Sequence, residues 1–96
     1  MKSERTIVLT ATDVEKIIKD LSVLIVSMDR MGSTFYDEPE RCALEMDKFF
    51  LEVKAFKLLA TARGVLTKAY NAQSSEVEIL RLEDEAERSL YWQFKK

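Results

Sequence analysis

The side chains that could do chemistry in this sequence are carboxylates and one thiol. Four carboxylates (Glu83, Asp84, Glu85 and Glu87) form an acidic run, and Cys42 is the single cysteine. The sequence contains no histidine, which excludes Ser-His-Asp and Cys-His nucleophile systems, histidine-bearing zinc sites and Glu-x-x-His di-iron sites. We therefore expect no catalytic residues, no metal site and no cofactor, and we interpret the acidic run as a solvated helix face.

Composition sets the class of protein. The chain has 96 residues, of which 47% are hydrophobic and 33% charged, with 2 glycines and 1 proline. These values predict one small all-α domain. A net charge of -2 provides no general attraction to nucleic acid or to an anionic membrane. A single cysteine and the lack of any apolar stretch near ~20 residues favour a cytoplasmic protein without a membrane partner.

The first two elements are a short arm and a helix. Residues 1–11 form the predicted arm, whose centre is β-branched and extended in character. The first helix is expected at about residues 13–31. It would begin at a capping box formed by Thr12 and Glu15 and end at Gly32, a favoured residue just beyond a helix C-terminus.

The second helix is expected to be long. Asp37 as N-cap and Pro39 in the first turn predict its start, and only Gly64 interrupts the pattern that follows. The predicted helix covers about residues 38–70, or roughly 48 Å. A second capping box, Ser75 with Glu78, opens a third helix expected at about residues 76–94.

The central helix carries apolar residues on two opposite sides. At helical spacing, one stripe contains Cys42, Met46, Phe49, Phe50, Val53, Phe56 and Ala60. Because two apolar faces need two covers, we predict a three-helix protein that packs as a helical homodimer. Its predicted interface consists of Met46, Phe49, Phe50, Val53 and Phe56. The alternative is a closed monomeric three-helix bundle with a bent central helix. Because Cys42 lies on the apolar stripe, we expect a buried, inert thiol; the alternative is a reactive thiol near the start of the helix.

Four aromatic residues fall outside the predicted core. Phe35 and Tyr36 belong to the loop after the first helix, while Tyr91 and Trp92 lie near the end of the third. Tyr and Trp often anchor protein interfaces, so these residues are the predicted partner-binding set. The alternative for Trp92 is that the third helix frays and the indole folds back onto the core.

These patterns favour a non-enzymatic regulator, such as a small inhibitor or anti-activator that binds another protein. One alternative is a nucleic-acid-binding transcriptional regulator that uses a basic line of Lys54, Lys57 and Lys68. The strongly acidic third helix opposes that alternative, because it would repel phosphates. A third possibility is a small helical enzyme. It would need cations directed into the bundle, whereas the apolar stripes contain no Arg or Lys.

Overall fold

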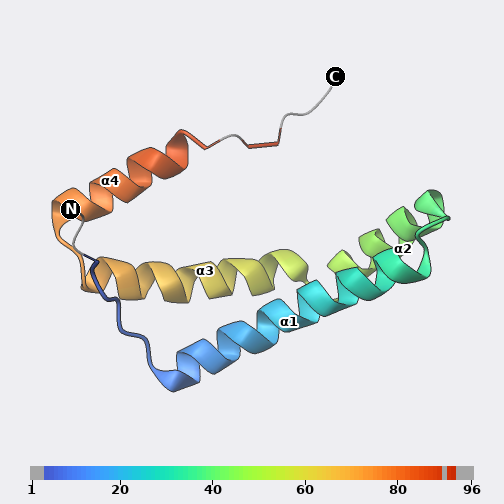
Figure 1. Ribbon diagram of the computed structural model, residues 1–96, viewed down its shortest axis with the longest axis horizontal. Coiled ribbons are helices and arrows are strands. Elements are labelled where there is room, and N and C mark those ends of the chain that lie inside the picture. Colours follow the sequence, from blue (N-terminus) through green and yellow to red (C-terminus); the bar gives the residue numbers. More distant parts are fainter. Residues whose placement is uncertain (1–3, 90, 93–96) are drawn as a thin grey trace.

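The computed structural model describes residues 4–89 and 91–92, which form helices and no strand. The four helices are α1 (Ala11–Thr34), α2 (Pro39–Glu52), α3 (Ala55–Ala72) and α4 (Glu76–Glu87). α2 and α3 return along α1 in the opposite direction, and α4 turns back from the end of α3 (Figure 1). The predicted all-α class is confirmed. The prediction of three helices is wrong, because the expected central helix is divided into α2 and α3.

The bounds of α1 differ from the expected ones at both ends. Thr10, not Thr12, is the N-cap, and its hydroxyl accepts a 3.1 Å hydrogen bond from the backbone N–H of Asp13. Both threonines precede an acidic residue by three positions, so the sequence offers two competing caps. The helix also continues through Gly32 to Thr34. A glycine inside a helix costs only about 1 kcal/mol relative to alanine, which packing readily offsets.

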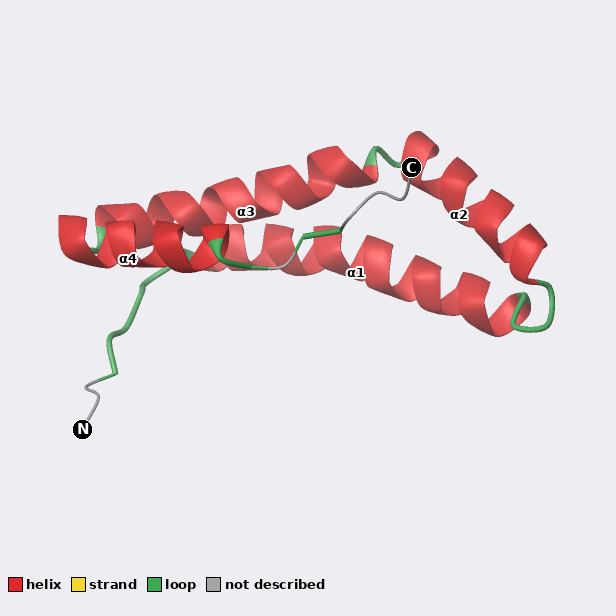
Figure 2. Cartoon of the chain, turned by 90° about the horizontal axis from the view of Figure 1, so that it is seen from above, coloured by secondary structure: helices red, strands yellow, loops and turns green. Residues whose placement is uncertain are grey.

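A break at Lys54 separates α2 from α3 without a glycine or a proline. Lys54 has φ 55° and ψ 54°, the left-handed conformation, and it is the one non-glycine residue with positive φ in the described part of the chain. α3 then runs on through Gly64. Figure 2 shows the change of direction at the break. Both α2 and α3 pack against α1, so tertiary contact has overridden local helix propensity here.

The start of α4 agrees with its sequence signal. The Ser75 hydroxyl accepts from the backbone N–H of Glu78, and the Ser75 N–H donates to Glu78 Oε1 at 2.8 Å. This confirms the second capping box. α4 ends at Glu87, and the expected end near residue 94 lies outside the described residues. Beyond the helix, the Tyr91 hydroxyl donates to the Ala86 carbonyl at 2.7 Å, satisfying one of the last helical acceptors.

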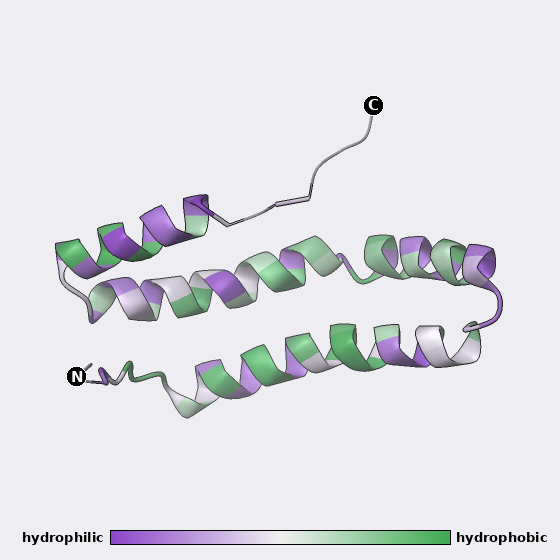
Figure 3. Cartoon of the chain, turned by 45° about the horizontal axis from the view of Figure 1, so that its top comes forward, coloured by the Kyte–Doolittle hydropathy of each residue, from purple (hydrophilic) through white to green (hydrophobic). Residues whose placement is uncertain are grey.

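The described core is a single narrow seam between α1 and α3. Ile17 and Leu24 of α1 are buried, as are Ala55 and Ala62 of α3. In both pairs the residues are two helical turns apart, and the small alanines let the two helices approach closely. Hydrophobic residues occur along all the helices (Figure 3), and many of the large ones are exposed and lie outside this core.

The radius of gyration and the accessible surface also show that little of the chain is buried. Its radius of gyration is 17.4 Å, whereas a compact chain of this length has about 12–13 Å. Its accessible surface is 8657 Å², against about 5,700 Å² for a compact monomer of 11.1 kDa. A single copy thus exposes a surplus of about 3,000 Å².

The left-handed conformation of Lys54 predicts whether a glycine at this position raises or lowers the free energy of unfolding. Lys54→Gly should raise the free energy of unfolding by about 1 kcal/mol, because glycine adopts the left-handed conformation without a Cβ penalty. A continuous helix would instead lose about 1 kcal/mol on the same change. Urea unfolding measures the difference. Lys57→Gly, within α3, is the matched control and should lower the free energy of unfolding.

Gly32 provides a second test of the helix bounds. A Cβ built at Gly32 meets nothing within 4 Å, and its backbone is helical. Gly32→Ala should therefore raise the free energy of unfolding by about 0.5–1 kcal/mol. A loss of stability in chemical denaturation would show that Gly32 ends α1 in the left-handed conformation, as the sequence alone suggested.

Candidate protein-binding surface

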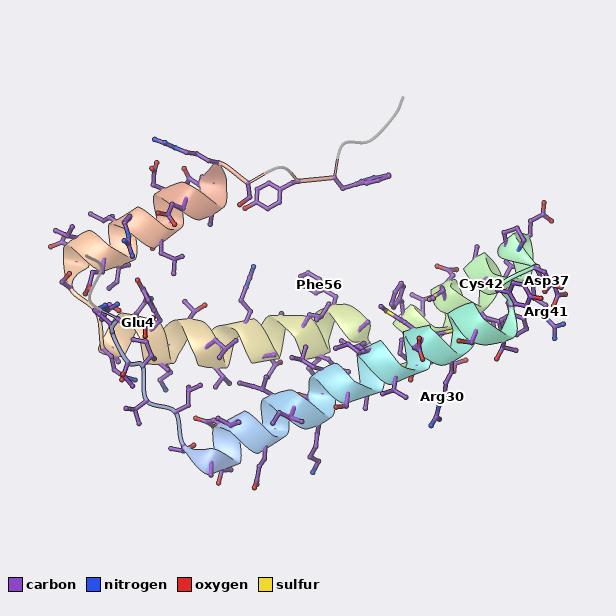
Figure 4. The ribbon with its side chains drawn as sticks, in the orientation of Figure 1. Glu4, Arg30, Asp37, Arg41, Cys42 and Phe56 are labelled. Carbon is purple, nitrogen blue, oxygen red and sulfur yellow. The ribbon has the colours of Figure 1, made fainter. Side chains whose placement is uncertain are left out.

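The residues predicted to form one dimer stripe are divided by the break. Phe49 borders a groove with Met31 of α1, so its ring is directed toward this chain's own first helix. Met46 and Val53 are half-buried, and Phe50 is exposed. Phe56 lies beyond the break and is 83% exposed; Figure 4 shows it on the edge of α3 that faces the α4 side. The five residues therefore do not form one continuous face.

Cys42 belongs to the same stripe and lies at the α1–α2 contact. It is half-buried, and its thiol points to the Met31 carbonyl, with 3.8 Å between Sγ and O. Figure 4 shows the side chain between the two helices.

The four predicted partner-binding aromatics lie in different settings. Phe35 is half-buried under the guanidinium of Arg41, whose Cζ lies 4.8 Å from the ring centre. Tyr36 and Trp92 are each 83% exposed, and Tyr91 is also exposed. An indole with this exposure is not folded back on the core. The structure places Tyr36 at the α1–α2 turn and Trp92 beyond α4, so they do not form one patch.

A further apolar row, most of it exposed, follows one flank of α1. At helical spacing it comprises Val14, Ile18, Leu21, Ile25 and Met28, of which Leu21 is half-buried and the other four are exposed. Ile18 is 57% and Ile25 61% exposed. Packing α1 against α2 and α3 covers only part of its apolar side chains, and most of this flank remains exposed.

An open groove lies between the N-terminal arm, α3 and α4. It has a volume of about 320 Å³ and an apolar lining. Its lining residues are Ile7 and Leu9 of the arm, Leu66, Thr67 and Tyr70 of α3, and Leu82 of α4. The arm therefore occupies the base of the angle between α3 and α4.

Arg5 fixes that angle. Its guanidinium donates to the Gln73 carbonyl and the Ser74 hydroxyl, each at 2.9 Å, and it forms an ion pair with Glu78. Its Cζ also lies 5.4 Å from the centre of the Tyr70 ring. Arg5 thus ties the arm to the end of α3 and to the first turn of α4. We call this cluster the Arg5 clamp.

Gln73 anchors the arm a little further along. Its side-chain amide accepts from the Val8 N–H at 2.8 Å and donates to the Val8 carbonyl at 2.7 Å, as a neighbouring strand would. The partners are 65 residues apart. No local pattern in the sequence indicates these distant partners.

Charge is strongly separated between α3 and α4. α3 contains Lys57, Arg63 and Lys68 and no acidic residue, whereas α4 contains six acidic residues and Arg81. Within the described ranges, none of the three α3 cations forms an ion pair. Arg63 is one turn from both Leu59 and Leu66, so this cation lies beside exposed apolar side chains on the margin of the apolar stripe.

Comparison with protein-family models, curated proteins and solved structures finds no match for this chain. Among residues 4–89 and 91–92, no helix is both long and apolar enough to cross a membrane. Over the same residues, no three potential metal-ligating side chains converge.

The Arg5 clamp predicts a pH dependence. The backbone N–H of Ser75 is the largest influence lowering the pKa of Glu78, and the Ser75 hydroxyl and the charges of Arg5 and Arg81 add to it. A carboxylate whose pKa is lower in the folded state stabilises the fold above its ordinary pKa of 4.5. That contribution is lost as the pH falls through the lowered value.

Glu78→Gln should therefore flatten the loss of stability below about pH 4.5. Thermal melts between about pH 3 and pH 7 measure this effect. Glu83→Gln makes the same chemical change in the same helix and should keep the wild-type acid profile. An unchanged profile in Glu78→Gln would contradict the lowered pKa of Glu78 in the folded state.

Proposed function

We propose that this chain is a non-enzymatic regulator that binds another protein, as a small inhibitor or anti-activator does, and that it works as a cytoplasmic homodimer. The observation that supports this most is the surplus of about 3,000 Å² over a compact monomer. Large exposed apolar patches on small proteins mark surfaces that other macromolecules cover.

The kind of exposed residue favours a protein partner. Tyr36, Tyr91 and Trp92 are exposed aromatics, and aromatic residues provide much of the binding energy at protein interfaces. The exposed row on α1 adds aliphatic area without a charged residue within it. A regulator with two separate apolar surfaces could bind its own copy and its target at the same time.

The surplus of exposed surface on a single copy supports the homodimer. Obligate dimers bury about 2,000–5,000 Å² in total, or about 1,000–2,500 Å² from each chain. The surplus on this chain is large enough for such an interface and leaves surface for a second partner. The sequence-based interface, Met46, Phe49, Phe50, Val53 and Phe56, remains one prediction for where the copies meet.

A nucleic-acid-binding regulator is the second candidate, because α3 has cations and no acidic residue. The six acidic residues of α4, next along the chain, weaken this candidate by repelling phosphates. Retention on DNA that collapses as salt rises would favour it over a protein partner.

Trp92→Ala tests the protein-binding proposal. Trp92 is 83% exposed, so its loss should leave the circular dichroism melt unchanged while reducing capture of the target at least about tenfold. The measurement is affinity purification of the tagged chain from its native host, compared with the wild type. Leu44→Ala removes another exposed apolar side chain and should retain capture. If Trp92→Ala captures as much target as the wild type, the Trp92 indole is not part of the binding surface.

A further inference from the structure

The open angle between α3 and α4 has matching apolar surfaces on its two sides. On α3, Phe56 is 83% exposed, and Leu59 and Leu66 are about half exposed on the same face. On α4, Leu82 lines the groove and remains partly exposed. Figure 1 shows α4 diverging from α3 after the turn, so these surfaces do not cover each other along their length.

The charges of the two helices are complementary. α3 has three cations and no acidic residue, and α4 has six acidic residues and one cation. In α4, Glu76, Glu83 and Glu87 follow the margin of the apolar stripe formed by Ile79, Leu82 and Ala86. An α3 helix lying along this stripe would bring Arg63 among carboxylates.

This chain's own α4 is held away from that position. Ile7 and Leu9 of the arm line the groove at the base of the angle, and the arm is fixed there by the two hydrogen bonds between Val8 and Gln73. The ion pair of Arg5 with Glu78 fixes the first turn of α4 relative to the end of α3. The arm thus forms one wall of the groove between α3 and α4.

We infer that a second copy of this chain occupies the open angle, with the acidic α4 of each copy along the basic α3 of the other. This inference rests on the homodimer proposed above and names its contact face. Each copy supplies both a basic and an acidic helix, so a two-fold axis satisfies both pairs at once and closes the assembly. α3 is about 27 Å long and α4 about 18 Å, so each contact between the copies would extend over several helical turns.

Paired charge reversals test the inference. One variant carries Lys57→Glu and Arg63→Glu, and the other carries Glu83→Lys and Glu87→Lys; all four positions are exposed. In either variant alone, the substituted side chains of one helix face side chains of the same charge on the other helix in both symmetric contacts. The dissociation constant of the dimer should rise at least about 100-fold in sedimentation equilibrium.

Mixing the two variants should restore a dimer. In the mixed pair, the reversed α3 of one variant meets the reversed α4 of the other, and the two unchanged helices meet at the second contact. Opposite charges therefore face each other at the substituted positions of one contact and along the unchanged helices of the other. A chain with all four substitutions should likewise be dimeric. The control Lys19→Glu with Arg30→Glu makes an equal charge change on α1 and should keep the wild-type dissociation constant.

Each result has a distinct meaning. A monomeric wild type would overturn the homodimer and this inference together. A dimeric wild type whose charge-reversed variants also remain dimeric would place the contact elsewhere, overturning the inference while the homodimer stands. If mixing fails to restore the dimer, or if the four-substitution chain recovers only as a monomer, α3 and α4 do not meet between copies and the inference is overturned.

Discussion

The small number of buried apolar residues is the constraint on which the rest of this structure depends. One seam, in which Ile17 and Leu24 of α1 meet the helix containing Ala55 and Ala62, provides the buried apolar residues of the described chain. Folding must offset the conformational entropy of every ordered residue, and net stability is only the small remainder. A seam this narrow leaves little margin, so additional burial against another chain is the natural source of stability.

Two local features determine which apolar side chains stay exposed: the backbone conformation at Lys54 and the contacts of the N-terminal arm. The left-handed Lys54 changes the direction of the chain between α2 and α3. As a result, Phe49 borders the groove toward α1 while Phe56 is left exposed. At the other end, the Arg5 clamp and the Val8–Gln73 pair set the arm into the base of the angle between α3 and α4. The arm therefore borders the groove that separates the acidic α4 from the basic α3.

Periodicity and capping signals predicted much of this fold. The apolar spacing of α1, the Ser75–Glu78 capping box and two apolar sides on the segment after Pro39 were all visible in the sequence. The break was not, because Lys54 is surrounded by good helix formers and only tertiary packing selects its conformation. Arg5 was likewise missed, because its partners lie near the far end of the sequence and leave no periodic signal. The off-core aromatics could be predicted from their positions, but not that they lie in separate places.

The central claim is that a single copy of this chain does not cover its own apolar surface. The most direct measurement is the thermal unfolding midpoint as a function of chain concentration, with the mass in solution determined alongside by light scattering. A homodimer predicts twice the chain mass of 11.1 kDa and a midpoint that rises with concentration, because dissociation accompanies unfolding. A midpoint independent of concentration, with a mass of 11.1 kDa, would contradict the account.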